Sequence, residues 1–427
     1  MAHPALAYRP HMDDRATCRA RFNGVRAQTL SLTDGLAPED MQIQTMPDVS
    51  PTKWHLAHVT WFFETFIAKP YLDNYQEFDP RFGYLFNSYY EQVGAQWSRS
   101  DRGLLSRPLH AEILNYRHHV ENAIGTLIDT ASGSDWALIA PLVELGCHHE
   151  RQHQELLLTD IKHVLSQAPD PHAPFGKIES APDAGGELAY LTFGESLIEM
   201  GASPDGFVFD NELPRHRRWL DAFEISARPV SNAEYLQFLD DGGYQNFRLW
   251  LSDGWAWLKE NDVQHPLYWR KTQTGWQEYT LHGLAPLQPG HPVCHISAYE
   301  AAAFAEWAGG RLPTEPELEQ LAIHHPAEGQ LLGANERYHP GRLIGTGKPE
   351  AVIGGVWEWS SSGYEAYPGY RAPDGAVGEY NGKFMSGQQV LRGGSCATGR
   401  DHIRPTYRNF FPANAQWQFS GIRLAKR

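Results

Sequence analysis

Two histidines one helical turn apart are the residues in this sequence whose spacing most directly suggests chemistry. The stretch GCHHERQHQELLL, residues 146–158, places His149 and His153 in an H-E-x-x-H pattern with Glu150. This pattern is typical of zinc peptidases, in which both histidines bind the metal and the glutamate acts as general base. The rest of the sequence has to decide whether the two histidines serve a different reaction.

The apolar residues around this motif indicate a helix with one face inside a bundle. Across residues 141–165, His149 and His153 share a 3.6-residue stripe with leucine, isoleucine and valine. Two imidazoles at positions i and i+4 on a buried stripe are costly to desolvate unless something binds them. Metal binding is therefore the favoured interpretation.

A second helix supplies a third inward histidine. In SPTKWHLAHVTWFFETF, Ser50 fits an N-cap and Pro51 fits the first helical position. His58 then shares its face with aromatic side chains, so a metal site of His58, His149 and His153 is expected. Imidazole suits zinc, copper and iron, so the ligands alone do not select the metal.

The peptidase interpretation weakens outside the core motif. A metzincin would have glycine at 156 and histidine at 159, where this chain has Leu156 and Thr159. Glu150 is also expected to lie off the buried stripe, where a general base would be misplaced. Glu155 is instead a candidate hydrogen-bond partner for a ligand histidine. A zinc hydrolase remains the less favoured alternative.

Composition excludes several classes of function. The chain has 427 residues and a net charge of −15, which argues against a nucleic-acid partner. No apolar run approaches the roughly 18 to 20 residues that cross a bilayer, and no secretory h-region is evident, so no membrane association and a cytoplasmic location are expected. The four cysteines lack C-x-x-C spacing and are expected to be free thiols.

The chain is expected to be an α+β protein with two domains. Residues 1–165 have helical periodicity and few glycines, which predicts a helical bundle. Residues 166–186 are rich in proline and glycine and predict a linker. Residues 187–427 have short apolar runs and frequent turn signals, so a loop-rich domain is expected there. Its clearest helix lies in 297–310 and ends at a glycine C-cap signal.

Several motifs carry a resemblance to known families. His149, His153 and Glu155, together with the upstream HLAH helix, resemble DinB-type four-helix bundles. The second half, with PVSNAEYLQF, GRLPTEPELEQLA, GGVWEWSSS, VLRGGS and FSGIRLA, is similar to the formylglycine-generating-enzyme (sulfatase-modifying factor) fold, related to C-type lectins. The pair in this order resembles the ergothioneine-pathway sulfoxide synthases, the EgtB and OvoA group, from about residue 15 to 427.

The resemblance implies a mononuclear non-haem Fe(II) enzyme, with Fe(2+) as cofactor. Such an enzyme uses O2 to join a thiol sulfur to an imidazole carbon of hercynine (Nα-trimethylhistidine) as a sulfoxide, in ergothioneine biosynthesis. The implied iron ligands are His58, His149 and His153. Gln152 and Asn409 match family positions that contact hercynine.

The trimethylammonium group of hercynine is a cation without a hydrogen-bond donor, so aromatic faces should hold it. Tyr380 or Phe410 is expected to line that pocket where the two domains meet, and Phe411 is a further expected substrate contact.

Two departures bear on the thiol donor. Members that use γ-glutamylcysteine carry a catalytic tyrosine three residues before the position of Tyr380, where this chain has Val377. They also carry an acidic residue two positions after that of Asn409, where this chain has Phe411. Both differences put the dipeptide in doubt and favour L-cysteine.

LFNSYYEQVG, with Tyr89 and Tyr90, and RSDRGLLSRP, with Arg99 and Arg102, resemble the second, cysteine-using type of EgtB. The resemblance implies that one tyrosine, with Tyr90 preferred, is the general acid during oxygen activation. The arginines would bind the cysteine carboxylate. On the residues alone, packing of the tyrosines in a loop and a solvated arginine surface remain alternatives.

Other chemistries also remain open. Ovothiol-type synthases couple cysteine to histidine at a different imidazole carbon, and selenoneine-type synthases use a selenium donor. A formylglycine-generating enzyme needs paired cysteines after RGGS, where this chain has Cys396 alone. A ligand-binding role of the second domain, in the manner of lectins, is compatible with the synthase interpretation.

Overall fold

The computed structural model describes residues 14–177, 186–333 and 337–427. The chain forms two compact units, and both draw on separate parts of the sequence. The first unit comprises Met1–Pro169, Ser203–Asp210 and Arg371–Gly382, and the second comprises Asp170–Ala202, Asn211–Tyr370 and Lys383–Arg427. Segments 203–210 and 371–382 thus join the helical unit although they lie far beyond the expected linker.

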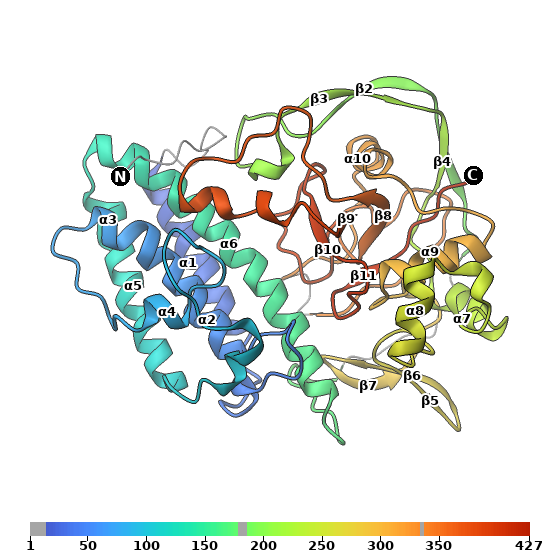
Figure 1. The fold of residues 1–427 in the computed structure, drawn as a ribbon, viewed down its shortest axis with the longest axis horizontal. Helices are drawn as coiled ribbons and strands as arrows, with labels where there is room; N and C mark the ends of the chain where they lie inside the picture. The colour runs from blue at the N-terminus through green and yellow to red at the C-terminus, as the bar shows by residue number, and fades with distance from the viewer. Residues whose placement is uncertain (1–13, 178–185, 334–336) are drawn as a thin grey trace. The chain divides into compact units, whose positions relative to one another are not determined.

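The first unit is a bundle of four long helices that lie side by side (Figure 1). They are α1 (Arg15–Ser31), α2 (Thr52–Phe63), α5 (His110–Thr130) and α6 (Gly133–Ser166). Helix α2 continues through a π-helical turn, Glu64–Ala68, into α3 (Lys69–Tyr71), and α4 (Phe82–Leu85) is a single turn. Short 3-10 turns occupy Asp40–Gln42 and Arg99–Leu104. The helical fold expected for the first domain is confirmed.

The expected start of α2 is wrong by one residue. The helix begins at Thr52, Pro51 is its N-cap, and no side chain caps it. The Ser50 hydroxyl accepts a hydrogen bond from Nη1 of Arg102 at 2.8 Å, and the Ser50 backbone N–H donates to Asp160 at 2.8 Å. Arg102 therefore binds the hydroxyl oxygen that would have accepted a first-turn N–H as the cap.

The expected position of Glu150 is also wrong. Its side chain is fully buried, and it accepts hydrogen bonds from Arg26 at 3.0 Å, Thr29 at 2.6 Å and Arg117 at 3.2 Å. Burial alone would raise the pKa of Glu150, but the two arginines lower it to about 2. Helices α1 and α5 supply these partners, so α6 is covered on more faces than its apolar stripe indicates. Glu150 is a structural carboxylate.

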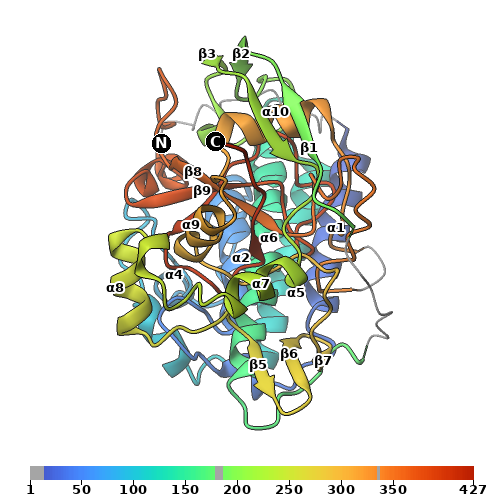
Figure 2. The same ribbon diagram turned by 90° about the vertical axis from the view of Figure 1, so that its right-hand side faces the viewer.

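Among the described residues, the second unit contains four small sheets. Strand β1 (Tyr190–Phe193) pairs antiparallel with β4 (Phe223–Ser226), and β2 (Ser196–Met200) with β3 (His216–Leu220). Strands β5 (Trp269–Thr272), β6 (Gly275–Thr280) and β7 (Gly283–Pro286) form an antiparallel sheet. The fourth sheet has the order β10 (Asn409–Pro412), β9 (Gln388–Arg392), β8 (Trp357–Gly363) and β11 (Ser420–Gly421), in which β11 and β8 run parallel. Within this unit, β2–β3 and β5–β7 lie at opposite ends (Figure 2).

The described part of the second unit contains four α-helices, and three of them begin with a capping box. They are α7 (Asn232–Asp240), α8 (Ser252–Glu260), α9 (Ala298–Trp307) and α10 (Glu315–His324). Ser297 and Glu300 form a capping box at α9, and Gly309 follows the helix with φ +71°. The helix expected in 297–310 and its glycine stop are confirmed.

Buried ion pairs hold strand β10 in the second unit. Arg408, directly before this strand, donates to Glu315 of α10 at 2.6 Å, and Arg392 of β9 donates to Glu319 at 2.7 Å. All four side chains are buried, so removing one partner would leave a charge without compensation, at a cost of about 3–5 kcal/mol. These contacts fix the strand on which Asn409 lies. The α+β class, a helical bundle followed by a loop-rich domain of short strands, is confirmed.

No helix among the described residues is both long and apolar enough to span a bilayer.

Candidate metal centre

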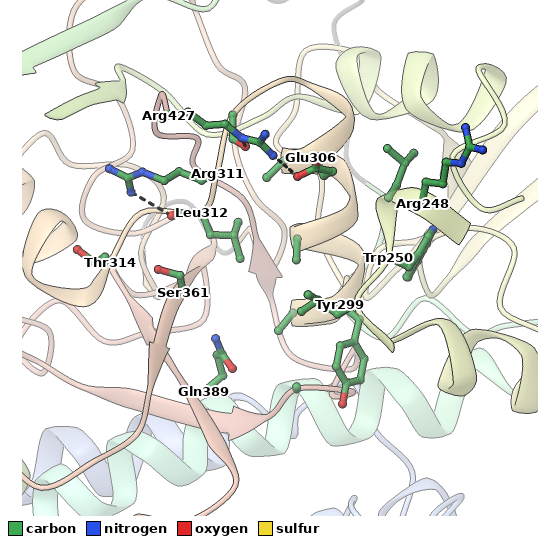
Figure 3. A pocket seen from close by; sticks show the side chains of 17 residues that line it. Arg248, Trp250, Tyr299, Glu306, Arg311, Leu312, Thr314, Ser361, Gln389 and Arg427 are labelled. Carbon is green, nitrogen blue, oxygen red and sulfur yellow. Dashed lines mark hydrogen bonds and ion pairs between the residues drawn. The ribbon is translucent and has the colours of Figure 1, made fainter. Parts of the chain in front are cut away.

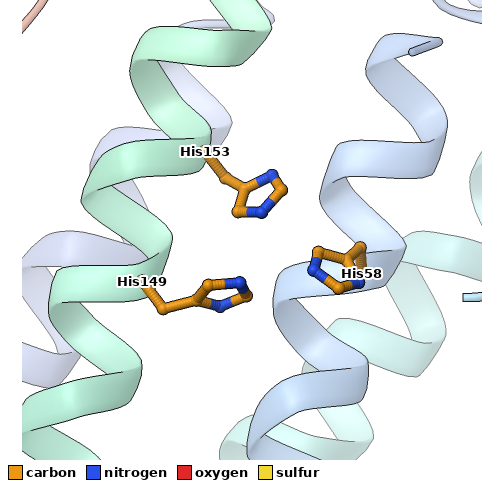
Figure 4. Close-up of side chains that lie close together, drawn as sticks. All are labelled: His58, His149 and His153. Atoms are coloured by element: carbon orange, nitrogen blue, oxygen red, sulfur yellow. The ribbon is translucent and has the colours of Figure 1, made fainter. Parts of the chain in front are cut away.

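Three imidazoles meet inside the helical unit. His58 extends from α2, and His149 and His153 extend from α6 toward it (Figure 4). One nitrogen from each ring lies within 4.8 Å of the corresponding nitrogens of the other two. The ring centroids are 5.0 Å apart for His58 and His149 and 4.6 Å apart for the other two pairs. The structure therefore brings together the three histidines that the sequence predicts as metal ligands.

Three ring nitrogens of this cluster have no hydrogen-bond partner in the part of the chain that the structure describes. Nδ1 of His58 donates to the carbonyl of Phe86 at 2.6 Å, which leaves the lone pair on Nε2. That Nε2 is buried, and neither it nor the two ring nitrogens of His149 have a hydrogen-bond partner among the described residues. Each unsatisfied buried polar group costs about 1–3 kcal/mol. Converging lone pairs of this kind fit a metal ion.

The electrostatics keep the imidazoles neutral. Burial lowers the pKa of His58 and His153 well below the ordinary value, and neighbouring histidines lower both further. Burial also lowers the pKa of His149 to about 3. Neutral imidazole is the form that binds metals, so the cluster is ready to bind an ion at neutral pH.

Aromatic rings hold His58 in place. Trp54 stacks on it at 4.6 Å with an interplanar angle of 11°, and Trp61 stacks at 5.5 Å and 16°. The Arg102 guanidinium lies 3.4 Å from the centroid of Trp54. Arg102 is buried and forms no ion pair with any described residue. Arg99, in contrast, is exposed and donates to the backbone carbonyl of Asp48 at 2.5 Å.

A carboxylate–histidine chain that was not predicted from the sequence supports His153. Nε2 of His55 lies 3.0 Å from Asp160, and its Nδ1 lies 2.9 Å from Nδ1 of His153. When Nε2–H of His55 donates a hydrogen bond to Asp160, Nδ1 of His55 accepts one from Nδ1–H of His153, so the His153 lone pair is on Nε2. The spacing of these residues could have indicated the chain. His55 precedes His58 by three residues and Asp160 follows His153 by seven, so each lies on the same helix face as a ligand histidine.

Replacing Asp160 with asparagine is expected to weaken metal binding by roughly 10- to 100-fold, the usual effect of losing a hydrogen-bond partner of a ligand histidine. Anaerobic titration of the metal-free protein with Fe(II) measures the change. Asp129→Asn, which removes a surface ion pair with Arg19, is the matched control. Thermal unfolding separates a folding defect from a binding defect, because Asp160 also accepts the Ser50 N–H. Wild-type affinity in a folded Asp160→Asn variant would show that the chain does not support His153.

The tyrosine pair lies in the loop that also contacts His58. Asn87 is buried, and it fixes this loop because it bonds both the N–H and the carbonyl of Tyr90 at 3.1 Å. Tyr90 is fully buried, stacks on Tyr89 at 4.6 Å and lies 5.6 Å from Trp61. Its hydroxyl bonds to no described residue. Burial raises the pKa of Tyr90 well above its ordinary value, so the phenol is protonated at neutral pH.

Gln152 and Tyr380 lie beside the histidines in the same unit. The Tyr380 hydroxyl donates to the side-chain carbonyl of Gln152. The Tyr380 ring stacks on Phe209 at 5.5 Å and meets His149 edge-on at 5.7 Å. Phe209 and Tyr380 belong to segments 203–210 and 371–382, so these segments bring aromatic surface to the metal cluster.

The remaining expected contacts lie on β10 of the second unit. Phe410 stacks on Tyr364 at 4.0 Å, and Phe411 meets Trp417 edge-on at 5.8 Å. Asn409 pairs with Leu391 of β9. The substrate roles of Asn409, Phe410 and Phe411 stay predictions.

A separate cavity of about 480 Å³ opens in the second unit beside α9 and β9 (Figure 3). Arginines line part of it, but Arg311 is ion-paired with Glu317 at 2.6 Å and Arg427 is ion-paired with Glu306. These cations already have carboxylate partners in the protein, so the cavity offers no strong anion site at these two positions.

Comparison with known proteins relates both units to described families. Residues 21–157 match the DinB superfamily, and residues 179–341 and 350–427 match the sulfatase-modifying factor enzyme 1-like domain. The chain is 29% identical to a hercynine oxygenase of Mycolicibacterium thermoresistibile over 97% of this chain and 95% of that protein. It is also 29% identical to a hercynine oxygenase of Mycolicibacterium smegmatis over 94% and 96% of the two chains. The structure of PvdO from Pseudomonas aeruginosa aligns with a TM-score of 0.38 and 17% identity, over 57% of this chain and 99% of that one.

The sulfatase-modifying factor match covers more than half of the chain, and the DinB match covers most of the helical unit. The two hercynine oxygenases align with nearly the whole chain, so the similarity extends across both domains in this order. The chain therefore belongs to the sulfatase-modifying factor enzyme 1-like family and, within it, to the EgtB family that begins with a DinB-type bundle.

Proposed function

We propose that the protein is a non-haem Fe(II) sulfoxide synthase that joins L-cysteine to hercynine with O2, as a step in ergothioneine biosynthesis. The observation that carries the proposal is the cluster of His58, His149 and His153, in which Nε2 of His58 and both ring nitrogens of His149 have no hydrogen-bond partner among the described residues. The relatives of similar length are named hercynine oxygenases, which agrees with this substrate. The four cysteines form no disulfide, which supports a cytoplasmic location as part of the proposal.

The three histidines would hold the metal through neutral imidazole nitrogens. Bound iron would supply redox activation of O2 and leave positions open for substrates. Phe86 and the Asp160–His55 chain orient two of the three rings, so the site needs little rearrangement on binding. Because the ligands are neutral, the site keeps the full positive charge of the ion to attract a thiolate.

The overall reaction balances without an added reductant. The hercynine C–H and the cysteine S–H each lose their hydrogen, and one C–S bond forms. One oxygen atom of O2 becomes the sulfoxide oxygen, and the other leaves as water with the two hydrogens. The enzyme therefore has to bind two substrates and O2 and to move protons, and it needs no further cofactor.

The residues around the cluster fit these tasks. Arg102 is a buried cation without a carboxylate partner among the described residues, and it suits the carboxylate of free cysteine. Tyr380 lies beside His149 and stacks on Phe209, so it brings aromatic surface that suits a trimethylammonium group. Gln152 lies next to this surface through its hydrogen bond with Tyr380. Tyr90 holds a proton on a hydroxyl that no described residue binds.

Anaerobic protein loaded with Fe(II), then given hercynine, cysteine and ¹⁸O2, tests the proposal. The expected product is a hercynine–cysteine sulfoxide that carries one ¹⁸O atom, identified by mass spectrometry. Parallel reactions with γ-glutamylcysteine, with a selenium donor and with histidine in place of hercynine rank the alternatives. Absence of a coupled product with every pair would overturn the proposal. Peptide hydrolysis by the zinc-loaded protein would support a zinc hydrolase instead.

A further inference from the structure

A second group of metal-binding residue types lies in the second unit, outside the site described above. It consists of Glu278 on β6, His291 in the loop between β7 and α9, and His339 in the segment after residue 336. One potential ligand atom from each lies within 4.8 Å of the others. All three side chains are buried, with exposed fractions of 5%, 4% and 6%.

The imidazole nitrogens of this group are incompletely used. Nε2 of His339 lies 3.2 Å from Oε1 of Glu278, but Nδ1 of His339 and Nδ1 of His291 have no hydrogen-bond partner among the described residues. Two ligand atoms each about 2.0–2.1 Å from a tetrahedral Zn²⁺ lie roughly 3.3 Å apart. The His339–Glu278 separation therefore suits a shared ion as well as it suits a hydrogen bond.

Hydrogen bonds position the segments that carry the group. Glu278 lies in the β6–β7 ladder opposite Ala285. The backbone of His291 accepts from the N–H of Asn232 at 2.8 Å, and the segment after His339 is tied back where the N–H of Leu343 donates to Gly290 at 2.9 Å. The group is thus held by main-chain contacts rather than by long flexible side chains. Preorganised ligands lose little entropy when an ion binds.

The fourth neighbour, His282, is already occupied. Its Nδ1 lies 2.9 Å from the carbonyl of Gly176, and its Nε2 accepts from the N–H of Tyr338 at 3.2 Å. These contacts exclude His282 as a metal ligand, so three candidate ligands remain. The cavity that these residues line has a volume of about 40 Å³. This space admits one or two waters but no organic substrate.

From this geometry we infer that Glu278, His291 and His339 bind one Zn²⁺ ion, with the fourth position filled by water in the small cavity. Two imidazoles and a carboxylate are an established zinc ligand set, and an open position beside three protein ligands is usual for zinc. The ion would fasten β6 to the two loops.

Arg337 is the residue that competes with the ion. Its Nη2 lies 3.4 Å from Nε2 of His291, near the long limit of a hydrogen bond. The Arg337 guanidinium would repel a bound Zn²⁺ ion, and it donates to a nitrogen of His291 that could bind the ion. Replacing Arg337 with alanine should therefore tighten zinc binding, whereas a purely structural polar network would only lose stability.

Metal stoichiometry of the full-length protein tests the inference without using catalytic activity. Metal-free wild-type protein should bind two equivalents of Zn²⁺, and His291→Ala or His339→Ala should bind one. In a His58→Ala/His149→Ala background, one equivalent should remain, and adding His291→Ala should remove it. His324→Ala, which changes an exposed histidine of α10, is the control and should keep the wild-type count.

Co²⁺ as a probe should give the intense visible bands of a four-coordinate site in that background. Glu278→Gln, which keeps the shape of the side chain, should weaken zinc binding more than the roughly 10- to 100-fold loss expected of a supporting residue, so the inference is testable even if an alanine variant fails to fold. Zinc binding of one equivalent in wild type, lost entirely in the His58→Ala/His149→Ala background, would overturn it. A failure of sulfoxide synthesis would leave these counts unchanged, so the two proposals fail separately.

Discussion

Replacing His149 with alanine is expected to abolish stoichiometric iron binding and to lower sulfoxide formation by at least about a thousandfold, or about 4 kcal/mol in the activation barrier. His149 is the one residue of the three whose two ring nitrogens both lack a partner among the described residues. Its removal takes away a metal ligand, whereas loss of a supporting partner costs roughly 10- to 100-fold. Iron content after anaerobic loading and product yield by mass spectrometry measure both effects.

His149 is 1% exposed, so alanine also leaves a cavity beside Phe62, whose ring lies 4.4 Å away. His149→Gln fills more of this space and should still lose iron, which separates the metal effect from a packing effect. His118→Ala changes an exposed histidine of α5 and serves as the control. Full iron content and wild-type yield in both His149 variants would remove this histidine from the proposed site.

Replacing Tyr90 with phenylalanine is expected to change which product forms rather than whether turnover occurs. Phenylalanine keeps the ring that packs on Tyr89 and Trp61 and removes only the hydroxyl. If this phenol is the general acid, C–S coupling should fall by roughly 10²- to 10⁴-fold. Cysteine would then be oxidised alone, taking up both atoms of O2 as cysteine sulfinic acid. The ratio of sulfoxide to sulfinic acid, read by mass spectrometry, is the measurement.

Tyr89→Phe is the natural comparison, because Tyr89 is the stacked neighbour in the same loop and is less deeply buried. A changed ratio in Tyr90→Phe with a near wild-type ratio in Tyr89→Phe assigns the proton to Tyr90. The reverse pattern assigns it to Tyr89. Wild-type ratios in both single variants and in the double variant would mean that neither phenol supplies the proton.

Much of the first site could be predicted because it lies on helices. The i, i+4 spacing of His149 and His153 puts both on one face of any α-helix, and the surrounding leucines mark that face as buried. His58 could be oriented by the same periodicity on a second helix. The capping box at Ser297 and Glu300 was equally readable, because it needs only residues three apart. These features depend on local backbone geometry.

The partners of these residues depended on how the helices pack. The apolar periodicity predicted that Glu150 lies off the buried face of α6. Helices α1 and α5 cover that side of α6 and supply Arg26 and Arg117 as its partners. The Ser50 hydroxyl was expected to cap α2, but it binds Arg102 from a later segment. A hydrophobic stripe identifies the most apolar face of a helix, but it does not show how many other helices pack against that helix.

Contacts made through loops were decided by the tertiary structure alone. Glu278, His291 and His339 are separated by up to 61 positions and lie on one strand and two irregular segments, so no period connects them. Tyr380 reaches Gln152 because segment 371–382 packs with the helical unit. The sequence by itself determined the domain order, the helical histidine pair and the inward face of α2. Which distant side chains meet was set by the path of the chain between elements, because loop conformation depends on the contacts of the folded protein and carries no repeating pattern in the sequence.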